Sequence, residues 1–339
     1  MPITLAEAQV NCQDDVDFAI IDDLRRRSWL FDQLTFDQAV NPAGGGATLT
    51  YGYTRLVTAA TATFRAINAE YTPGEAVRTR ETVDLKPLGG SFNVDRVLAN
   101  LGPAATNEEA FQFAELNKGA ITELQNQLIN ADTAVNANGF DGLDKALAGT
   151  TTETFGDGTD PATNQFLNWT STGITDESGA HTALDMLDEL VSLVEGGADA
   201  IMGNDRSIAR VRSIARRAGY YTRSEDSLGR VVEMFGNSVL VDLGFGNDGT
   251  SRIVPIESRD VDGDGGTTPA VTGLTDLYAV RFDLDAFHGV ATVGELVKTY
   301  RPDYTAPGAV KLGELEIGPV APVLKSTRGA AVLRNVKVM

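Results

Sequence analysis

One long stretch of the chain repeats apolar side chains every three or four residues. Between residues 107 and 133 these side chains are Phe113, Leu116, Ala120, Ile121, Leu124, Leu128 and Ala131. The spacing predicts an amphipathic helix over 107–133, and the capping box Thr106-Asn107-Glu108-Glu109 marks its start. At 1.5 Å per residue this helix is roughly 40 Å long. We expect it to run along a flat or elongated body, because a compact core would not cover both ends.

Shorter periodic stretches fill the rest of the chain. Residues 178–194 and 205–218 predict amphipathic helices, and a shorter helical pattern covers 15–27. Apolar or alternating segments predict strands at 198–202, 230–235, 238–243, 252–256, 277–282, 311–317 and 330–338. This mixture predicts an α+β protein.

Residues 48–90 have an unusual composition, rich in the strand formers Thr, Val, Tyr, Phe and Ile. Residues 61–67 and 77–85 alternate loosely, and Tyr71-Thr72-Pro73-Gly74-Glu75 between them is a turn signal. The pattern predicts a long β-hairpin with few large side chains to face a core. An isolated two-stranded ribbon is marginal in water, so we expect this one to lean on another subunit. The alternative is an ordinary hairpin that packs on its own domain.

Composition and charge narrow the class of protein. The chain has 339 residues, with 28 Lys and Arg against 47 Asp and Glu, and a formal net charge of −19. The length suggests about two domains. Such acidity argues against a nucleic-acid binder that neutralises phosphates. The sequence has no apolar run of about 20 residues and therefore predicts no membrane span. The N-terminus lacks the pattern of a signal peptide. The single Cys12 fits a reducing cytoplasm.

Two motifs suggest a ligand site, and each has a simpler interpretation. Residues 244–249 match GxGxxG, but a strand pattern with a proline follows where a dinucleotide site needs a helix, which favours a hairpin turn. Asp260, Asp262 and Asp264 resemble the start of a calcium loop, but Val271 stands where a bidentate Glu belongs. A solvated acidic turn is the favoured interpretation, with a weak calcium site as the alternative.

Other chemistry finds little support in the sequence. The two histidines, His181 and His288, have no metal-binding neighbourhood, and no GxSxG, Walker or CxxC motif occurs. We expect no enzyme activity and no cofactor. The helix predicted at 205–218 carries five arginines, which either pair with acidic groups of a neighbouring chain or form a solvated face balanced by local Asp and Glu.

The order of these elements resembles the major capsid proteins of tailed bacteriophages, which have the Hong Kong 97 fold that encapsulin shells share. The order runs from an arm through a long Thr-rich hairpin and a long capped helix to a strand-rich second half. The segment Gly139-Phe140-Asp141-Gly142-Leu143 stands where the family often has a Gly-Leu segment. The resemblance covers almost the whole chain.

The resemblance implies a domain organisation. Residues 1–47 would be the N-terminal arm and 48–90 the extended loop that reaches over a neighbouring subunit. Residues 91–196 and 300–339 would form the peripheral domain with the long spine helix, and 197–299 the axial domain. Some members cross-link through a lysine in the extended loop. Here Lys86, near the predicted base, is the only lysine of that range, so we expect non-covalent contacts.

The resemblance also implies a function. The chain would self-assemble into pentamers and hexamers of an icosahedral shell around double-stranded DNA, made in the host cytoplasm and located in the virion capsid. Expected partners are other copies of the chain, a portal and a scaffolding protein, without membrane contact. The alternatives are an encapsulin-like compartment and, less favoured, a small-oligomer calcium-binding protein or enzyme. Candidate subunit contacts are the charged residues Arg65, Glu70, Arg78, Arg80, Glu81, Arg210, Arg212, Arg216 and Arg217.

Overall fold

The structure is a computed structural model. It describes residues 29–41, 48–96, 108–155, 166–174, 176–217, 222–225, 231–261 and 270–339. The helix predicted at 15–27 lies outside these residues. Part of the range predicted as an arm belongs to the body, in α2 (Trp29–Gln33) and β1 (Phe36–Val40). Leu30, Leu34 and Val40 are buried in the core, because this segment carries apolar side chains that an extended arm would expose.

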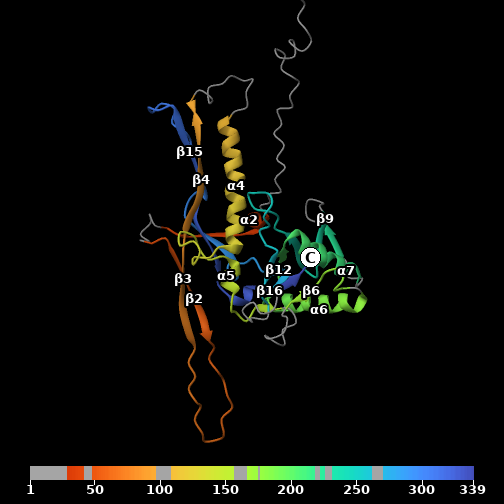
Figure 1. Cartoon of the computed structure of the whole chain (residues 1–339). Coiled ribbons are helices and arrows are strands. Elements are labelled where there is room, and N and C mark those ends of the chain that lie inside the picture. The colour runs from red at the N-terminus through yellow and green to blue at the C-terminus, as the bar shows by residue number, and fades with distance from the viewer. Residues whose placement is uncertain are drawn as a thin grey trace, which may run out of the picture.

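A five-stranded sheet is built around one long strand, β15. Its strand order is β1-β13-β15-β14, and β4 also pairs with β15. Residues 314–317 of β15 pair with both β14 and β4, so these two strands occupy opposite edges of β15. The long helix α4 lies along β4 and β15 (Figure 1). The bounds of these elements are β4 Lys86–Asp95, β13 Phe287–Thr292, β14 Val297–Tyr300, β15 Val310–Leu324 and α4 Glu108–Asn130.

A second, nine-stranded sheet has the order β5-β16-β12-β7-β10-β9-β8, with β11 paired to β12 and β6 to β16. Helices α6 and α7 pack against one another beside this sheet (Figure 1). The bounds are β5 Glu153–Phe155, β6 Leu167–Asn168, β7 Ala200–Gly203, β8 Thr222–Glu225, β9 Val231–Phe235, β10 Ser238–Asp242, β11 Glu257–Arg259, β12 Val271–Val280, β16 Ala330–Lys337, α6 Glu177–Ser192 and α7 Asp205–Arg217. The short elements α5 (Leu143–Leu147) and η1 (Thr327–Gly329) complete the body.

Two hydrophobic clusters hold the body together. One joins α4, α5 and both sheets, with Leu124, Leu128 and Ile129 of α4 at most 1% exposed. The other lies between α6, α7 and the nine-stranded sheet. Buried Gln125 links the first cluster to its surroundings, since it accepts from the Leu30 amide at 3.1 Å and donates to the Leu243 carbonyl at 2.8 Å.

A buried ionic network lies beside these clusters. Arg334 of β16 pairs with Asp276 of β12 at 3.1 Å, with Glu153 of β5 at 2.8 Å, and with Asp144 of α5. Arg259 of β11 adds a 2.6 Å contact to Asp276. Burial disfavours the charged form of Arg334, but the carboxylates of Asp276 and Asp144 outweigh that effect and raise its pKa. The network ties five elements, β5, β11, β12, β16 and α5, into one body.

The predicted long helix is confirmed as α4, three residues shorter at its end than 107–133. The chain turns back there, with the Gly142 amide donating to the Ala131 carbonyl at 2.7 Å. A side chain at Gly142 would lie 2.6 Å from the Ile129 carbonyl oxygen. Glycine is therefore required where this segment folds onto the helix.

Most other predicted elements are confirmed, although β12 begins six residues before the predicted 277 and β15 ends seven residues after the predicted 317. The strand predicted at 252–256 is wrong. Residue Arg252 makes only an isolated bridge to Phe245, and the regular strand β11 begins at Glu257. Ile253 and Val254 are buried as parts of a loop. Their apolar character reflects this burial rather than a place in a sheet.

The third sheet is the hairpin of β2 (Thr50–Thr58) and β3 (Val77–Asp84), which pair with each other. The second arm of the predicted hairpin is confirmed as β3. The first arm is wrong, because residues 61–67 form no strand and β2 lies eleven residues earlier. The antiparallel register pairs Thr50 with Asp84 and Leu56 with Arg78.

The sheets do not follow the ranges expected for the two domains. Strand β13 and all of β14 except its last residue, Tyr300, fall in the range 197–299. Both strands nevertheless belong to the five-stranded sheet. Strand β16 falls in the range 300–339 but lies in the nine-stranded sheet between β5 and β12. The peripheral and axial assignments themselves stay predictions.

Candidate subunit interface

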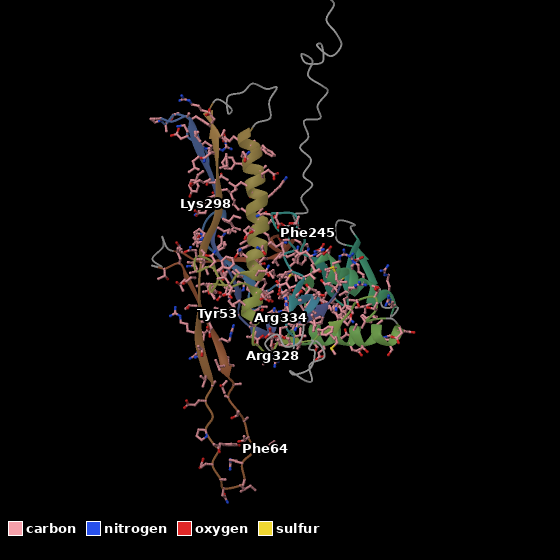
Figure 2. All side chains as sticks on the ribbon, viewed as in Figure 1. Tyr53, Phe64, Phe245, Lys298, Arg328 and Arg334 are labelled. Carbon is pink, nitrogen blue, oxygen red and sulfur yellow. The ribbon has the colours of Figure 1, made fainter. Side chains whose placement is uncertain are left out.

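The hairpin projects away from the rest of the described chain (Figures 1 and 2). Residues 59–76 beyond its paired strands, here called the hairpin tip, contain no regular strand. Phe64 and Ile67 in the tip are 108% and 92% exposed. The hairpin tip therefore does not fold back on its own domain, and the expectation that it leans on another subunit stays a prediction.

The opposite end of the hairpin, here called the hairpin root, is fixed to the body by Tyr51, Tyr53 and Arg55. Alternation along β2 turns these three side chains to one face. The Arg55 guanidinium donates to the Lys325 and Leu324 carbonyls, both at 2.9 Å. The Tyr53 hydroxyl donates to the Leu324 carbonyl at 3.3 Å. The root is therefore anchored at the end of β15.

His288 of β13 lies beneath the hairpin root. Its side chain is fully buried, and its ring stands edge-on to the Tyr51 ring with the centroids 6.4 Å apart. Neither ring nitrogen makes a hydrogen bond of normal geometry. Burial lowers the pKa of His288, and nearby Lys325 adds to that effect; the Ala286 backbone, Asp37 and Asp283 oppose it without outweighing it.

The hairpin tip has an internal turn that fixes its shape. The Arg65 guanidinium donates to the carbonyls of Ala66 and Ala69 at 3.3 and 3.2 Å. The guanidinium also lies 5.2 Å from the centre of the Tyr71 ring. Asn68 takes a φ of 70°, a left-handed conformation that Asn adopts more easily than most residues. The tip therefore presents its apolar side chains from a structured turn.

The other charged candidates on the hairpin lie on different faces. Arg78 and Arg80 are exposed, and the Arg80 guanidinium lies across Gly52, where a side chain would come within 3.0 Å of Nη2. Glu81 is half-buried and lines a hollow beside the hairpin root, together with Tyr53 and Arg55. Glu70 is exposed on the tip. The structure leaves all of these on the projecting ribbon, and their contacts with another chain stay a prediction.

The arginines of α7 have partners within the chain. Arg212 forms an ion pair with Glu233 of β9, Arg210 donates to the Val338 carbonyl at 3.2 Å, and Arg217 donates to the Ile174 carbonyl. Arg216 donates to the Arg212 carbonyl at 3.3 Å. Helix α7 lies apart from the hairpin (Figure 1). The α7 side chains proposed as subunit contacts already make contacts within the chain.

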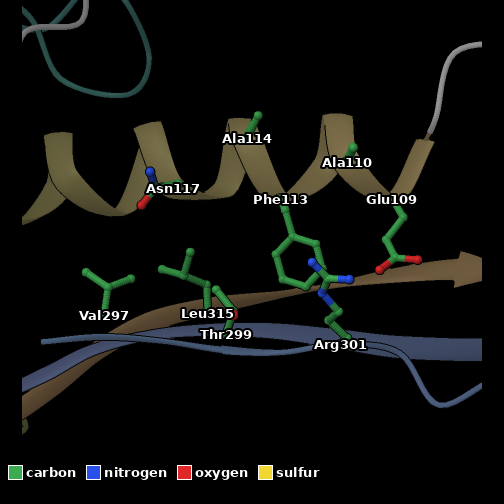
Figure 3. A pocket seen from close by; sticks show the side chains of 9 residues that line it. All are labelled: Glu109, Ala110, Phe113, Ala114, Asn117, Val297, Thr299, Arg301 and Leu315. Carbon is green, nitrogen blue, oxygen red and sulfur yellow. The ribbon is translucent and has the colours of Figure 1, made fainter. Parts of the chain in front are cut away.

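A groove of about 570 Å³ runs between the first half of α4 and strands β14 and β15 (Figure 3). Its walls are mainly apolar, and Glu109 and Arg301 lie near one end (Figure 3). The Glu109 carboxylate also accepts from the Tyr304 hydroxyl at 3.0 Å. Its lining residues are Glu109, Ala110, Phe113, Ala114, Asn117, Val297, Thr299, Arg301 and Leu315.

The remaining sequence candidates contribute little to a site. Residues 244–249 form a turn in which the Gly249 amide donates to the Gly246 carbonyl at 3.0 Å, as the hairpin-turn interpretation predicts. Asp260 is exposed, while residues 262 and 264 lie outside the described residues. Within the part of the chain that the structure describes, no helix is long and apolar enough to cross a membrane.

Sequence reasoning missed the hairpin root, the burial of His288 beneath it, and the groove. The alternation of Tyr51, Tyr53 and Arg55 is a signal for an anchored strand that could have been found. The groove joins residues near 110 to residues near 300 and has no local signal.

This arrangement of two packed sheets, a long helix and a projecting hairpin is the Hong Kong 97 fold, shared by capsid and encapsulin shell structures. The expected α+β class and the resemblance to tailed-phage capsid proteins are confirmed. No family model matches the chain, and no curated protein matches it in sequence.

Several solved structures have this fold across nearly the whole chain. The SrpI encapsulin complex from Synechococcus elongatus PCC 7942 superimposes with a TM-score of 0.64 at 14% identity, covering 100% of this chain and 98% of that chain. The capsid of a native GTA particle gives 0.60 at 12% identity, with 99% of each chain covered. The capsid of Myoviridae phage XM1 gives 0.55 at 13%, covering 96% and 98%.

Proposed function

We propose that the chain is a structural major capsid protein of a tailed-bacteriophage type of particle. It forms pentamers and hexamers that close into an icosahedral shell around double-stranded DNA. The projecting hairpin supports this proposal most directly, because a two-stranded ribbon with exposed faces gains stability when another copy covers it. The proposed role is structural rather than catalytic. The chain is made in the host cytoplasm and is located in the virion capsid, and its further partners are a portal and a scaffolding protein.

The charge and the hairpin chemistry support the same function. A net charge of −19 per chain gives an inner wall that repels DNA, so packed DNA can slide without adhering. The contacts between copies are non-covalent, since Lys86 pairs with Val320 in the body sheet rather than standing on the tip. Obligate interfaces of more than about 2,000 Å² are expected.

An encapsulin-like compartment is the second candidate. The superposition on the SrpI encapsulin, with a TM-score of 0.64, favours it. The two candidates differ in what the shell contains, because an encapsulin-like shell would hold protein cargo and a capsid would hold DNA.

Expression of the full chain, followed by gel filtration and negative-stain imaging, tests the shared part of both candidates. We expect capsomers or megadalton particles. A monomer or small oligomer under all assembly conditions contradicts the shell function. Nucleic-acid staining of particles purified from the native source then separates the two: DNA inside supports the capsid, and protein cargo without DNA supports the compartment.

Charge reversal on the hairpin tests its role in assembly. Arg78→Glu with Arg80→Glu is expected to reduce the yield of shells, because both exposed arginines are proposed to meet acidic groups of a neighbour. A matched double reversal of Arg206 and Arg328, both exposed on the body, controls for net charge. Equal yields from both variants would count against the hairpin contact.

A further inference from the structure

Strand β4 has one edge that no other strand of the described chain covers. Within the described residues β4 pairs only with β15. On the other side, the amide of Leu85, just before β4, donates to the Leu49 carbonyl at 2.8 Å, and from Pro87 onward the described residues add no strand to this side. An open edge presents N–H and C=O groups with which another strand can pair.

Backbone hydrogen bonds alternate in direction along β4, and one contact shows which residues face the open edge. The Arg96 amide donates to the Ala309 carbonyl at 3.0 Å, in the register of the antiparallel β4–β15 pair. Every second residue back from Arg96 therefore bonds toward β15. The residues between them, Gly89, Ser91 and Asn93, turn their N–H and C=O groups toward the open edge.

The opposite side of β15 gives the same direction. The Gly318 amide donates to the Leu296 carbonyl at 2.8 Å, in the register of the β14–β15 pair, so even-numbered residues of β15 bond toward β14. Odd-numbered residues therefore bond toward β4, where Leu315 pairs with Gly90. The backbone groups of Gly90 thus face β15, and those of Ser91 face the open edge.

The open edge is also suited in charge to contact between identical copies. The eight residues from Pro87 to Val94 include no charged side chain, although 22% of the chain is charged. Native edges are commonly blunted by charged side chains or bulges, but the β4–β15 register has no shift between Leu88 and Asp95. Two acidic chains can therefore meet along this stretch without like charges facing each other, while the partial charges of N–H and C=O groups complement one another.

Helix α4 holds the edge in place. The Phe92 ring stands edge-on to the Phe113 ring of α4 with the centroids 4.7 Å apart, while Ser91 and Asn93, which alternation turns to the other face, are exposed. This end of β4 lies away from the hairpin tip (Figure 1). An ordered edge loses little conformational entropy when it binds, so β4 offers copies of the chain a surface separate from the hairpin.

We propose that β4 of one copy pairs antiparallel with β4 of a second copy about a two-fold axis at Ser91. This inference rests on the proposed shell function and assigns a contact between rings, because an isologous contact joins two copies whereas a ring needs head-to-tail contacts. Ser91 lies opposite Ser91 of the second copy, and Gly89 lies opposite Asn93. This register gives each of the three outward residues a partner with which it exchanges both backbone hydrogen bonds.

The acidic side chains nearest to the edge do not oppose the pairing. Glu314 is exposed on β15 and pairs with Ser91. In the joined sheet it is three strand spacings from Glu314 of the second copy, about 14 Å. This distance exceeds the Debye length of about 8 Å at physiological ionic strength, so salt screens the repulsion between the two carboxylates.

Disulfide formation at the two-fold axis tests the pairing in assembled particles. In a Cys12→Ser background the chain carries Ser91→Cys, and mild oxidation of the shells is followed by a non-reducing gel. Opposite residues of a hydrogen-bonded pair have Cα atoms about 5.5 Å apart, within the range of a disulfide, so we expect a covalent dimer. In the matched control, Asn93→Cys, the two thiols are more than about 13 Å apart. That control and Thr182→Cys, exposed on α6, are expected to stay monomeric.

The outcomes separate this proposal from the shell function. Shells in which Ser91→Cys stays monomeric, or in which Asn93→Cys or Thr182→Cys cross-links equally, overturn the β4 pairing and leave the shell function intact. A wild-type chain that forms neither rings nor shells overturns the shell function and, with it, the pairing.

Removal of one outward N–H group provides an independent measurement. Ser91→Pro deletes an amide that faces the open edge and spares the β4–β15 ladder, whereas Ser91→Ala keeps that amide. We expect Ser91→Pro to form rings but to raise the protein concentration needed to join them into shells by about tenfold, which corresponds to about 1.4 kcal/mol. Ser91→Ala should leave that concentration unchanged. A Ser91→Pro chain with a normal unfolding transition that closes shells as readily as Ser91→Ala overturns the proposal.

Discussion

Two antiparallel strand pairs in this chain have the same ladder of hydrogen bonds and opposite surroundings. In the β12–β16 pair nearly every residue after Leu274 is buried, and both strands have long apolar runs. In the β2–β3 pair the outward positions are exposed, and burial alternates only near the root. The β12–β16 pair therefore contributes to the stability of the single chain, whereas the β2–β3 pair leaves exposed the surface that we propose another copy covers.

This difference separates two kinds of mutational effect. Changes in the buried pair should act on the free energy of unfolding of the isolated chain. Changes in the hairpin should act on assembly while the isolated chain remains folded. Substitutions placed in turn in the buried pair, at the junction with the hairpin, at the hairpin root and at the hairpin tip therefore test the comparison. The expected loss of stability decreases in that order.

The largest loss is expected in the buried ionic network. Arg334→Met removes the guanidinium that contacts Asp144, Glu153 and Asp276 and leaves their carboxylates with fewer partners. Breaking a buried ion pair from one side costs about 3–5 kcal/mol. Chemical unfolding of the unassembled chain measures this change.

The exposed Arg206 on α7 supplies the matched control, because Arg206→Met should change the free energy of unfolding by less than about 0.5 kcal/mol. If Arg334→Met is equally mild, the network does not stabilise the body and the comparison fails at its buried end.

A smaller, pH-dependent loss is expected at the junction of body and hairpin. Burial lowers the pKa of folded His288 below its ordinary value of 6.5. Below about pH 6.5 the unfolded chain therefore binds more protons than the folded chain, and the free energy of unfolding decreases. The loss is at most about 1.4 kcal/mol for each pH unit. His288→Phe keeps an aromatic ring against Tyr51 and should remove this contribution.

The measurement compares urea unfolding at about pH 7.5 and about pH 5.5 for both proteins. The wild type should lose more stability than His288→Phe over this interval. His181, exposed on α6 and 3.6 Å from Glu177, provides the control: His181→Gln should retain the wild-type difference. Identical pH responses of wild type and His288→Phe would show that His288 does not titrate in this range.

The sequence predicted the regular, local features and missed those made by distant contacts. The 3.6-residue period defined α4 because one face of the helix, from Leu116 onward, packs against the first cluster. The first hairpin strand was misplaced because residues 61–67 have the same strand-forming composition as β2, while Tyr53 and Arg55 find their partners some 270 residues away. The Arg334 network joins residues 58 to 190 positions apart, and the groove joins residues near 110 to residues near 300, so no local pattern encodes them.

At the root, a still smaller global effect is expected with a clear local one. Arg55→Met removes the donors to the Leu324 and Lys325 carbonyls. Since Tyr51, Tyr53 and Val83 of the hairpin only pack against the edge of the first cluster, and Arg55 contributes hydrogen bonds rather than apolar burial, global stability should fall by less than about 1 kcal/mol. Amide exchange in β2 and β3 should accelerate, as measured by mass spectrometry. Arg78→Met, on the exposed part of β3, should leave exchange at the root unchanged. Equal acceleration by both variants would contradict an Arg55 anchor.

The smallest loss of stability is expected at the tip, where one substitution can be compared at both extremes. Phe287 in β13 is 1% exposed and Phe64 is 108% exposed. Phe287→Ala leaves a cavity and should cost about 3–5 kcal/mol, whereas Phe64→Ala removes no contact within the chain and should cost less than about 0.5 kcal/mol. Assembly should respond in the opposite way, since folded Phe64→Ala subunits lack an exposed side chain of the hairpin that another copy is proposed to cover. A tip variant that unfolds easily would mean that Phe64 already stabilises its own chain, and the distinction between the two strand pairs would no longer hold.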